Sequence, residues 1–298
     1  RNHAYFCSIS LKFCFFGEKM MQAVLNDLTR YLDFLRKTGL FVSICRFDEV
    51  FSPCLSTLFL YEIHTHAVCH AMKKRADTRR RCIRHKHTTL CRHEALTPFY
   101  GGCWAGVEEF VFPVVQGEKV LMYLNVTGFR GQSDTAHLRR EKFLKKNPEF
   151  LPYFRELSDD VPTVDELLPA LRPLRYMIFA LADTCRQLPC KTDESDRICR
   201  QIVEFLCENY ADDLSAVAIS EAIGYSVSYV QHLFRQKSGE TIGQFLQKLR
   251  LKKAAELLRT TSLPIIRIAA DTGFCDQNYF SVCFKKAFSV SPKEYRKR

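Results

Sequence analysis

The chain has 298 residues, of which 47% are hydrophobic and 26% are charged, a balance typical of a globular protein with two domains. Its net charge of +11 favours a polyanionic partner such as nucleic acid. No run of about 18 apolar residues occurs, so we expect neither a membrane-spanning helix nor a membrane partner.

The first residues, 1–19, do not read as part of a folded domain. The chain begins at Arg1, and the apolar stretch 9–16 is not followed by a small-x-small cleavage site. Met20 and Met21 are alternative starts. We therefore expect residues 1–19 to be an upstream or poorly ordered segment.

Residues 20–135 mix helical and strand patterns. Gly39 is suited to end the first helix, and the turn at 116–118 separates two strand-like runs as a hairpin. The expected elements are a helix at 18–37, a strand at 40–47, helices at 59–72 and 77–93, and strands at 107–115 and 119–126. This pattern predicts an α+β module of the sensory type.

Residues 136–192 are helical and interrupted by prolines. The longest apolar periodicity runs from Thr163 to Gln187 and contains Pro169 and Pro173. We expect this segment to be a helical connector whose apolar face pairs with a second copy, giving a homodimer.

Residues 193–298 contain two helix-turn-helix units, at about 214–239 and 264–288, joined by a long helix at 241–259. Each unit has a short apolar-periodic helix, a Gly-Tyr or Gly-Phe turn, and a longer helix that ends in Phe and a basic residue. A helix at 196–209 precedes them, and the capping box Ser291–Glu294 predicts a short final helix. Such a pair places two helices in successive major grooves of double-stranded DNA.

The outward residues of the second helix of each unit are candidates for contact with DNA. Gln231 has the amide for a bidentate contact to adenine, and Ser228 and His232 have groups that bond bases or phosphates. Core spacing places Tyr229 inward, and Tyr279 is expected to be core or partly core. The phosphate candidates are Arg235, Lys285, Lys286 and Arg296, joined by the basic residues of the linking helix, Lys248, Arg250, Lys252, Lys253 and Arg259.

Residues 268–296, IAADTGFCDQNYFSVCFKKAFSVSPKEYR, resemble the signature of the AraC/XylS family of transcription regulators. The resemblance covers about 193–298 and implies an all-α domain that contacts two adjacent major-groove segments, with RNA polymerase as a further partner. By position it implies base reading by Ser228, Gln231, His232, Gln277, Asn278, Ser281 and Val282. Val282 departs from the arginine that many relatives carry.

The segment 64–103 is rich in histidine and cysteine. It holds six of the nine histidines and four cysteines, but no CxxC pair. The cysteines of a chain this long favour free thiols in a reducing cytoplasm. One interpretation is a core lined by thiols. Another is a zinc, copper or iron–sulfur site, or a redox sensor, at Cys69, Cys82 and Cys103.

Residues 103–113, CWAGVEEFVFP, and 123–128, YLNVTG, resemble the PocR sensory domain, a PAS-like module. The resemblance spans about 20–135 and implies a small-molecule effector, for which polyols have been suggested. Thr127–Gly128 stands where a Gly-Gln pair is expected. The effector-binding candidates are Cys82, Cys103, Trp104, Glu108 and Tyr123.

Together these patterns predict a cytoplasmic, effector-controlled DNA-binding regulator with a PAS-like domain, a helical connector and an all-α C-terminal domain. No cofactor is firmly expected. No nucleophile–base pair or HExxH motif occurs, so we expect no enzyme activity. The alternative is a regulator that senses metal or redox state through the Cys/His segment.

Overall fold

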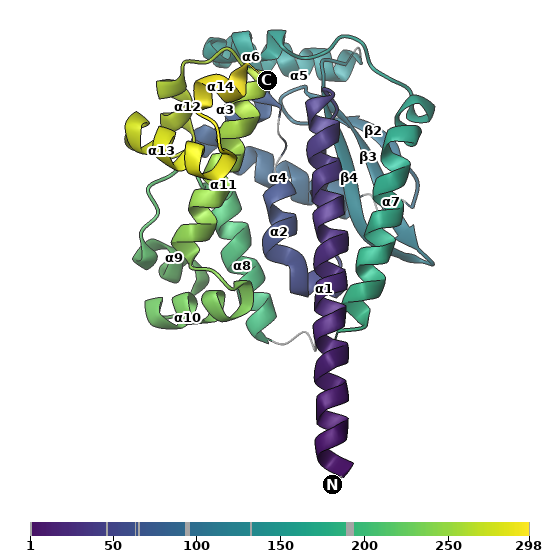
Figure 1. Ribbon diagram of the computed structural model, residues 1–298. Helices are drawn as coiled ribbons and strands as arrows, with labels where there is room; N and C mark the ends of the chain where they lie inside the picture. The colour runs from purple at the N-terminus through teal and green to yellow at the C-terminus, as the bar shows by residue number, and fades with distance from the viewer. Residues whose placement is uncertain are drawn as a thin grey trace.

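A computed structural model of the chain describes residues 2–45, 47–62, 64, 66–92, 96–131, 133–188 and 194–297, without the side chains of 2–16 and 86–92. The N-terminal part, residues 17–188, is helical around a small sheet, and the C-terminal domain, residues 194–297, is all helical (Figure 1). No helix among the described residues has the length and apolar content needed to span a membrane. Residues 2–19, expected to be an upstream or poorly ordered segment, are helical and belong to α1 (Asn2–Lys37).

The sheet has four antiparallel strands in the order β1-β4-β3-β2. The strands are β1 Phe41–Cys45, β2 Phe99–Gly102, β3 Glu108–Gln116 and β4 Lys119–Phe129. Gly117, at φ 64°, makes the β3–β4 hairpin that the sequence predicted. Alternation along β1 and β4 puts Val42, Ile44 and Val126 on one apolar face, which packs against α1 and α7.

The helix expected at 59–72 is wrong, because the chain breaks there into shorter pieces. After α1 (Asn2–Lys37), the chain forms η1 (Glu49–Cys54), α2 (Leu55–Leu58), η2 (Phe59–Tyr61), α3 (Ala67–Lys74) and α4 (Ala76–Arg92). His66 caps α3, since its ring accepts from the amide of Val68. An N-cap in extended conformation starts a new helix and ends the previous one.

The connector is helical, as predicted, but it belongs to the core of the N-terminal part. It comprises α5 (Asp134–Lys146), η3 (Pro148–Phe150), α6 (Leu151–Arg155) and α7 (Val164–Arg186). α7 continues through Pro169 and Pro173, and its apolar residues pack against α1 and the sheet. Because that face is filled within the chain, homodimerisation stays a prediction and would need another surface.

The C-terminal domain follows the expected element order. Its helices are α8 Glu194–Asn209, α9 Ala216–Ile223, α10 Val227–Ser238, α11 Ile242–Thr260, α12 Ile265–Asp271, α13 Gln277–Phe288 and α14 Pro292–Arg296. Ser226 and Asp276 cap the two longer helices of the units, and Ser291 forms the predicted capping box with Glu294. These side chains satisfy backbone amides that the first helical turn leaves unpaired.

Candidate nucleic-acid interface

The first helix-turn-helix unit consists of α9 and α10. Gly224 makes the turn in the left-handed region, at φ 82°, where residues with a Cβ are strained. On α10, Val230, Leu233 and Phe234 are buried at helical spacing, as predicted. The opposite face of α10 is therefore free to meet a partner.

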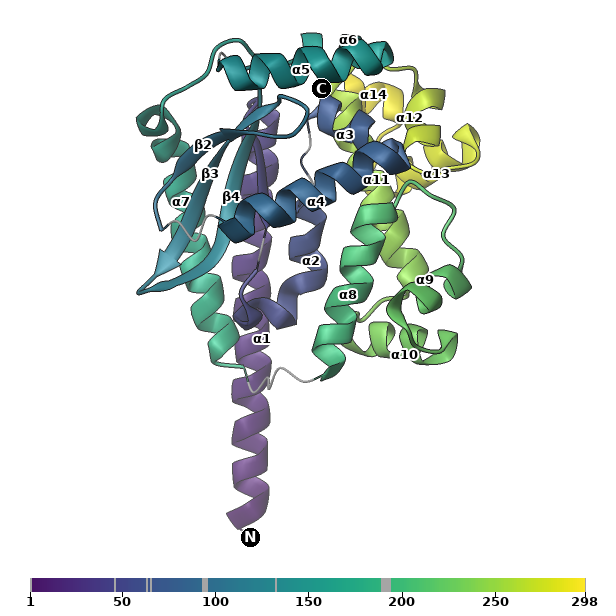
Figure 2. The ribbon, with the colours of Figure 1, turned by 180° about the vertical axis from the view of Figure 1, so that it is seen from behind.

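The second unit, α12 and α13, repeats this design. Gly273 makes its turn at φ 85°, and a Cβ there would lie 2.9 Å from the carbonyl oxygen of Tyr210. Phe280 and Phe284 are fully buried on the inner face of α13. In both views α10 and α13 lie on the side of the molecule away from the sheet (Figures 1 and 2).

The predicted base-reading residues lie on this outer side. Five are exposed, namely Ser228, Gln231, His232, Asn278 and Val282, and two are half-buried, namely Gln277 and Ser281. Val282 is 67% exposed. The Ser281 hydroxyl donates to the carbonyl of Gln277 at 2.9 Å, so it is engaged within the helix. The two recognition helices thus expose several hydrogen-bonding side chains and one apolar side chain, that of Val282.

Two tyrosines depart from their expected place in the core. Tyr229 is 41% exposed and stacks on Tyr225, with ring centroids 5.2 Å apart. Tyr279 is 56% exposed, and its hydroxyl accepts from the amide of Gln247 at 3.0 Å. They occupy equivalent positions just before the buried Val230 and Phe280. At 100° from those positions, a large ring reaches the helix edge and not the core.

The basic residues divide into exposed and engaged groups. Arg235, Lys285 and Lys286 are exposed on the recognition helices and fit their predicted role at phosphates. Arg296 instead donates to the carbonyl of Leu263 at 2.5 Å, so its guanidinium helps hold the end of the domain.

The cations of α11 differ in exposure: Lys248 is exposed, whereas Arg250, Lys252 and Arg259 are half-buried and Lys253 is buried. Lys248 pairs with Glu240 at 2.7 Å, and Arg250 donates to the carbonyl of Tyr210 at 2.7 Å. Burial lowers the pKa of Lys252 to about 7 and that of Lys253 to about 8. A lysine held in this way contributes little to phosphate binding, so the linking helix is a structural element more than a DNA contact.

The residues predicted for an effector lie in separate clusters. Trp104 donates from its ring nitrogen to the sulfur of Cys82 at 3.3 Å, and both pack with Cys103 in one apolar cluster. Glu108 is buried elsewhere, where it accepts from Tyr100 at 2.8 Å and from Ser133. Tyr123 packs with Cys45 and Val111. The structure therefore brings three of the five together.

Burial governs the chemistry of the thiols. It raises the pKa of Cys69 well above its usual value, raises that of Cys82, and raises that of Cys103 to about 12. The three thiols are neutral at physiological pH, whereas thiolates bind metals and react with oxidants. Within the described part of the chain, no three His, Cys, Asp or Glu side chains converge as metal ligands. The side chain of Cys91 lies outside that part.

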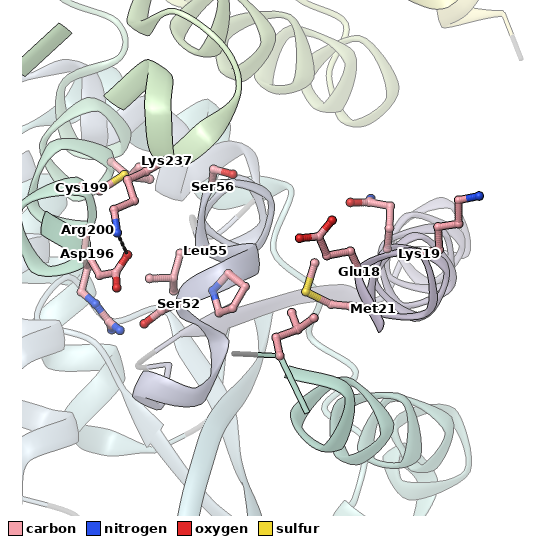
Figure 3. A pocket seen from close by; sticks show the side chains of 14 residues that line it. Glu18, Lys19, Met21, Ser52, Leu55, Ser56, Asp196, Cys199, Arg200 and Lys237 are labelled. Atoms are coloured by element: carbon pink, nitrogen blue, oxygen red, sulfur yellow. Dashed lines mark ion pairs between the residues drawn. The ribbon is translucent and has the colours of Figure 1, made fainter. Parts of the chain in front are cut away.

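A cleft of about 580 Å³ lies where the N-terminal part meets the first unit (Figure 3). Met21 and Leu55 line one side, and Asp196 and Arg200 of α8 line the other. Lys237 of α10 pairs with Asp196 at 2.8 Å across its edge. No pattern in the sequence indicates this cleft, because its walls come from segments about 180 residues apart.

This fold, with two outward recognition helices, defines a double helix-turn-helix DNA-binding protein. Residues 219–298 match a family model described as a helix-turn-helix domain. The HTH-type transcriptional activator RhaR of Mannheimia succiniciproducens is 52% identical over 220 residues, which cover 63% of this chain and 78% of that protein. The chain belongs to the AraC/XylS family of DNA-binding transcription regulators, which are not enzymes.

Two further relatives match the C-terminal domain. The regulatory protein SoxS of Salmonella typhimurium is 35% identical over 102 residues, covering 34% of this chain and 95% of that protein. A solved structure of the C-terminal domain of AraT, a response regulator from Geobacillus stearothermophilus, is 36% identical and covers 35% of this chain and 88% of its own, with a TM-score of 0.34.

Proposed function

We propose that the protein reads an asymmetric double-stranded DNA site with both recognition helices, under the control of a small-molecule effector held by the N-terminal part. The observation that carries the DNA proposal is the shared outward direction of α10 and α13, with polar side chains exposed on each. The recognition helices of successive units fit major-groove segments about 34 Å apart.

The two helices present different chemistry, which predicts two unlike half-sites. Gln231 has the amide for a bidentate contact to adenine, beside the hydrogen-bonding His232. On α13, Gln277 and Asn278 offer amides, and the exposed Val282 suits the methyl group of thymine. Arg235, Lys285 and Lys286 would contact phosphates and make binding depend on salt.

Substitutions on the recognition helices test this assignment. A site is first selected from random duplex DNA with the full chain. Gln231→Ala and Gln277→Ala should then weaken binding to that site by about fivefold to 100-fold while binding to unrelated DNA hardly changes. Gln201→Ala is the matched control, because Gln201 is an exposed glutamine on α8, outside both recognition helices. Equal losses on specific and unrelated DNA would refute base reading.

Effector control rests on the half-buried cluster of Cys82, Cys103 and Trp104 and on the resemblance to small-molecule sensory modules. An effector that changes DNA binding must bind one arrangement of the protein better than the other. Propane-1,2-diol and glycerol are suitable probes. Either should raise the melting temperature of the full chain, and Trp104→Ala should abolish the shift. No shift with any small polyol would contradict polyol control.

The cleft is a second candidate location for an effector. Its volume of about 580 Å³ falls within the roughly 300–1,000 Å³ of small-molecule sites. It borders both α1 and α8, so an occupant would touch the N-terminal part and the first unit together. Arg200→Ala should abolish the thermal shift if the effector binds there, whereas Trp104→Ala should leave it intact.

Metal or redox sensing is the second candidate function, favoured by the nearness of Cys69, Cys82 and Cys103, which affect one another's pKa. The raised pKa values make the thiols poor ligands and slow nucleophiles, so we rank this function lower. Metal analysis of anaerobically purified protein decides the matter, with stoichiometric zinc or iron as the supporting result.

Contact with RNA polymerase and self-association complete the proposal. The relative RhaR is named a transcriptional activator, which supports activation by this chain. Purified polymerase on a promoter carrying the selected site should give more transcript when the protein is added. Sedimentation of the full chain, free and on DNA, would show the predicted homodimer.

A further inference from the structure

The apolar core divides the two DNA-binding units unequally. One continuous core runs from the sheet and α1 through α8 into the first unit, and includes Phe59, Cys207 and Phe234. The second unit has its own core around Leu257, Phe280 and Phe284. Among the described residues, that second core contains none from before Leu251. The first unit is thus built onto the N-terminal part, while the second is a separate body at the far end of α11.

Polar contacts bind this second body to the N-terminal part. Lys74, at the end of α3, forms an ion pair with Asp271 of α12, whose side chain is 6% exposed and also pairs with Arg267 of the same helix at 3.0 Å. Arg36 of α1 pairs with Glu256 of α11 at 2.7 Å, and Lys253 pairs with the same carboxylate at 3.1 Å. Apolar packing therefore holds the first unit against the N-terminal part, whereas ion pairs hold the second unit there.

The bend between α3 and α4, residues 70–79, touches the loop that leads into the first unit and the second unit itself. His70 shares a hydrogen bond of 2.6 Å with the hydroxyl of Tyr210, at the entrance to the first unit. Arg79 binds the carboxylate of Asp212 at 2.8 Å and 3.2 Å. Lys74, between them, reaches the second unit. One short segment of the N-terminal part therefore links the loop in front of the first unit to the second unit.

Buried ion pairs add little net stability but favour one geometry, because drawing the partners apart loses their attraction without returning water to the buried charges. Reading two half-sites demands such strictness, since the two recognition helices must enter the groove about one turn apart. α11 links the two units, but a helix alone does not fix how the unit at each of its ends is oriented. The contacts of residues 70–79 are a second connection between the two ends of α11, in addition to the helix itself.

We propose that Lys74, with its partner Asp271, is a positioning residue that sets the half-site spacing the protein accepts, by fixing the second unit relative to the first. The contact lies away from the recognition faces, so it acts on spacing and not on base preference. The proposal rests on the proposed reading of DNA by both units.

The test compares DNA sites with altered spacing, using the full chain and the selected site. The probes are the whole site, each half alone, and the whole site with one base pair inserted between halves. The wild-type protein should lose about tenfold or more in affinity on insertion, the cost of an ill-fitting half-site. Lys74→Met and Asp271→Asn should lose about threefold or less on insertion, because the second unit then adjusts.

Controls separate this inference from the function on which it rests. Arg80→Met removes an exposed cation of α4 and should keep the wild-type spacing preference. Half-site affinities should be the same for all variants, which excludes a general loss of folding. Wild-type spacing preference in both Lys74→Met and Asp271→Asn would overturn the inference. A wild-type protein that binds whole and half sites equally would instead overturn reading by both units.

Discussion

Arg36 of α1 and Glu256 of α11 form an ion pair of 2.7 Å although 220 positions separate them, and their side chains are only 2% and 6% exposed. The guanidinium also donates to the carbonyl of Val42 and stacks over the ring of Tyr61. The pair joins the first helix of the N-terminal part to the helix that links the two DNA-binding units. The linking helix is therefore a component of both parts of the molecule.

Removal of one partner should destabilise the protein strongly, because it leaves a buried charge unpaired. Glu256→Gln and Arg36→Ala should each lower the free energy of unfolding by about 3–5 kcal/mol in denaturant titrations. The pair Arg186–Asp183, at 2.6 Å, is about half exposed and serves as the control. Arg186→Ala should leave stability nearly unchanged. Equal effects of Arg36→Ala and Arg186→Ala would contradict the role of the buried pair.

Gly273 should tolerate no side chain. Its φ of 85° strains any residue with a Cβ, and that atom would meet the Tyr210 carbonyl at 2.9 Å. Gly273→Ala should cost about 1–3 kcal/mol in unfolding free energy. Gly243→Ala is the matched control, since a Cβ there meets nothing within 4 Å and α11 is helical at that position. If Gly243→Ala raises the unfolding free energy and Gly273→Ala does not lower it, the turn at Gly273 accommodates a Cβ and the prediction is wrong.

Stability should fall as the pH drops below 6.5. Burial lowers the pKa of His66 from its ordinary value of 6.5 to about 4, and burial and neighbouring lysines lower that of His70 well below 6.5. The unfolded chain therefore takes up protons before the folded chain does. The contribution of these two histidines to stability is full above pH 6.5, and below it stability declines by up to about 1.4 kcal/mol per pH unit for each histidine.

Urea unfolding at pH 7.5, 6.5 and 5.5 measures this decline before most carboxylates titrate. His66→Asn keeps a side chain suited to cap α3 but removes one titrating group, so its decline should be shallower than that of the wild type. If the stability of His66→Asn declines with pH as steeply as that of the wild type, groups other than His66 cause the decline.

The buried thiols should react slowly. Burial raises the pKa of Cys103 to about 12 and that of Cys69 well above its usual range, whereas Cys275 is exposed at the turn of the second unit. Iodoacetamide at pH 7.5 should label Cys275 well before Cys103 and Cys69, as followed by mass spectrometry. Rapid labelling of Cys103 in the folded protein would instead support redox sensing.

Local signals in the sequence predicted the C-terminal domain well. Ser226 and Ser291 cap helices where capping residues were expected, and Gly224 and Gly273 make the two turns; the cap at Asp276 was not predicted. Such features act within a few residues of the chain, so they are visible without a structure. Tyr229 and Tyr279 were assigned wrongly, because periodicity alone does not separate the edge of a buried face from its centre.

Relationships between distant segments were not predictable. The pairing of Arg36 with Glu256 and of Lys74 with Asp271 depends on how the two parts dock, and no periodic pattern encodes that. The effector candidates were chosen from one stretch of sequence, but β-strand alternation and a bulge at Glu108 and Glu109 send those side chains in different directions. The sequence therefore did not predict which of these candidate side chains lie together.

The reading of two unlike half-sites by α10 and α13 is tested most directly by changing one base contact. Val282→Arg places a bidentate donor at a position that is 67% exposed on α13. Sequences selected by this variant should change at one position, toward guanine, in one half-site only. Val217→Arg, exposed on α9, should leave the selected sequence unchanged. Changes in both half-sites, or no change with Val282→Arg, would contradict the account.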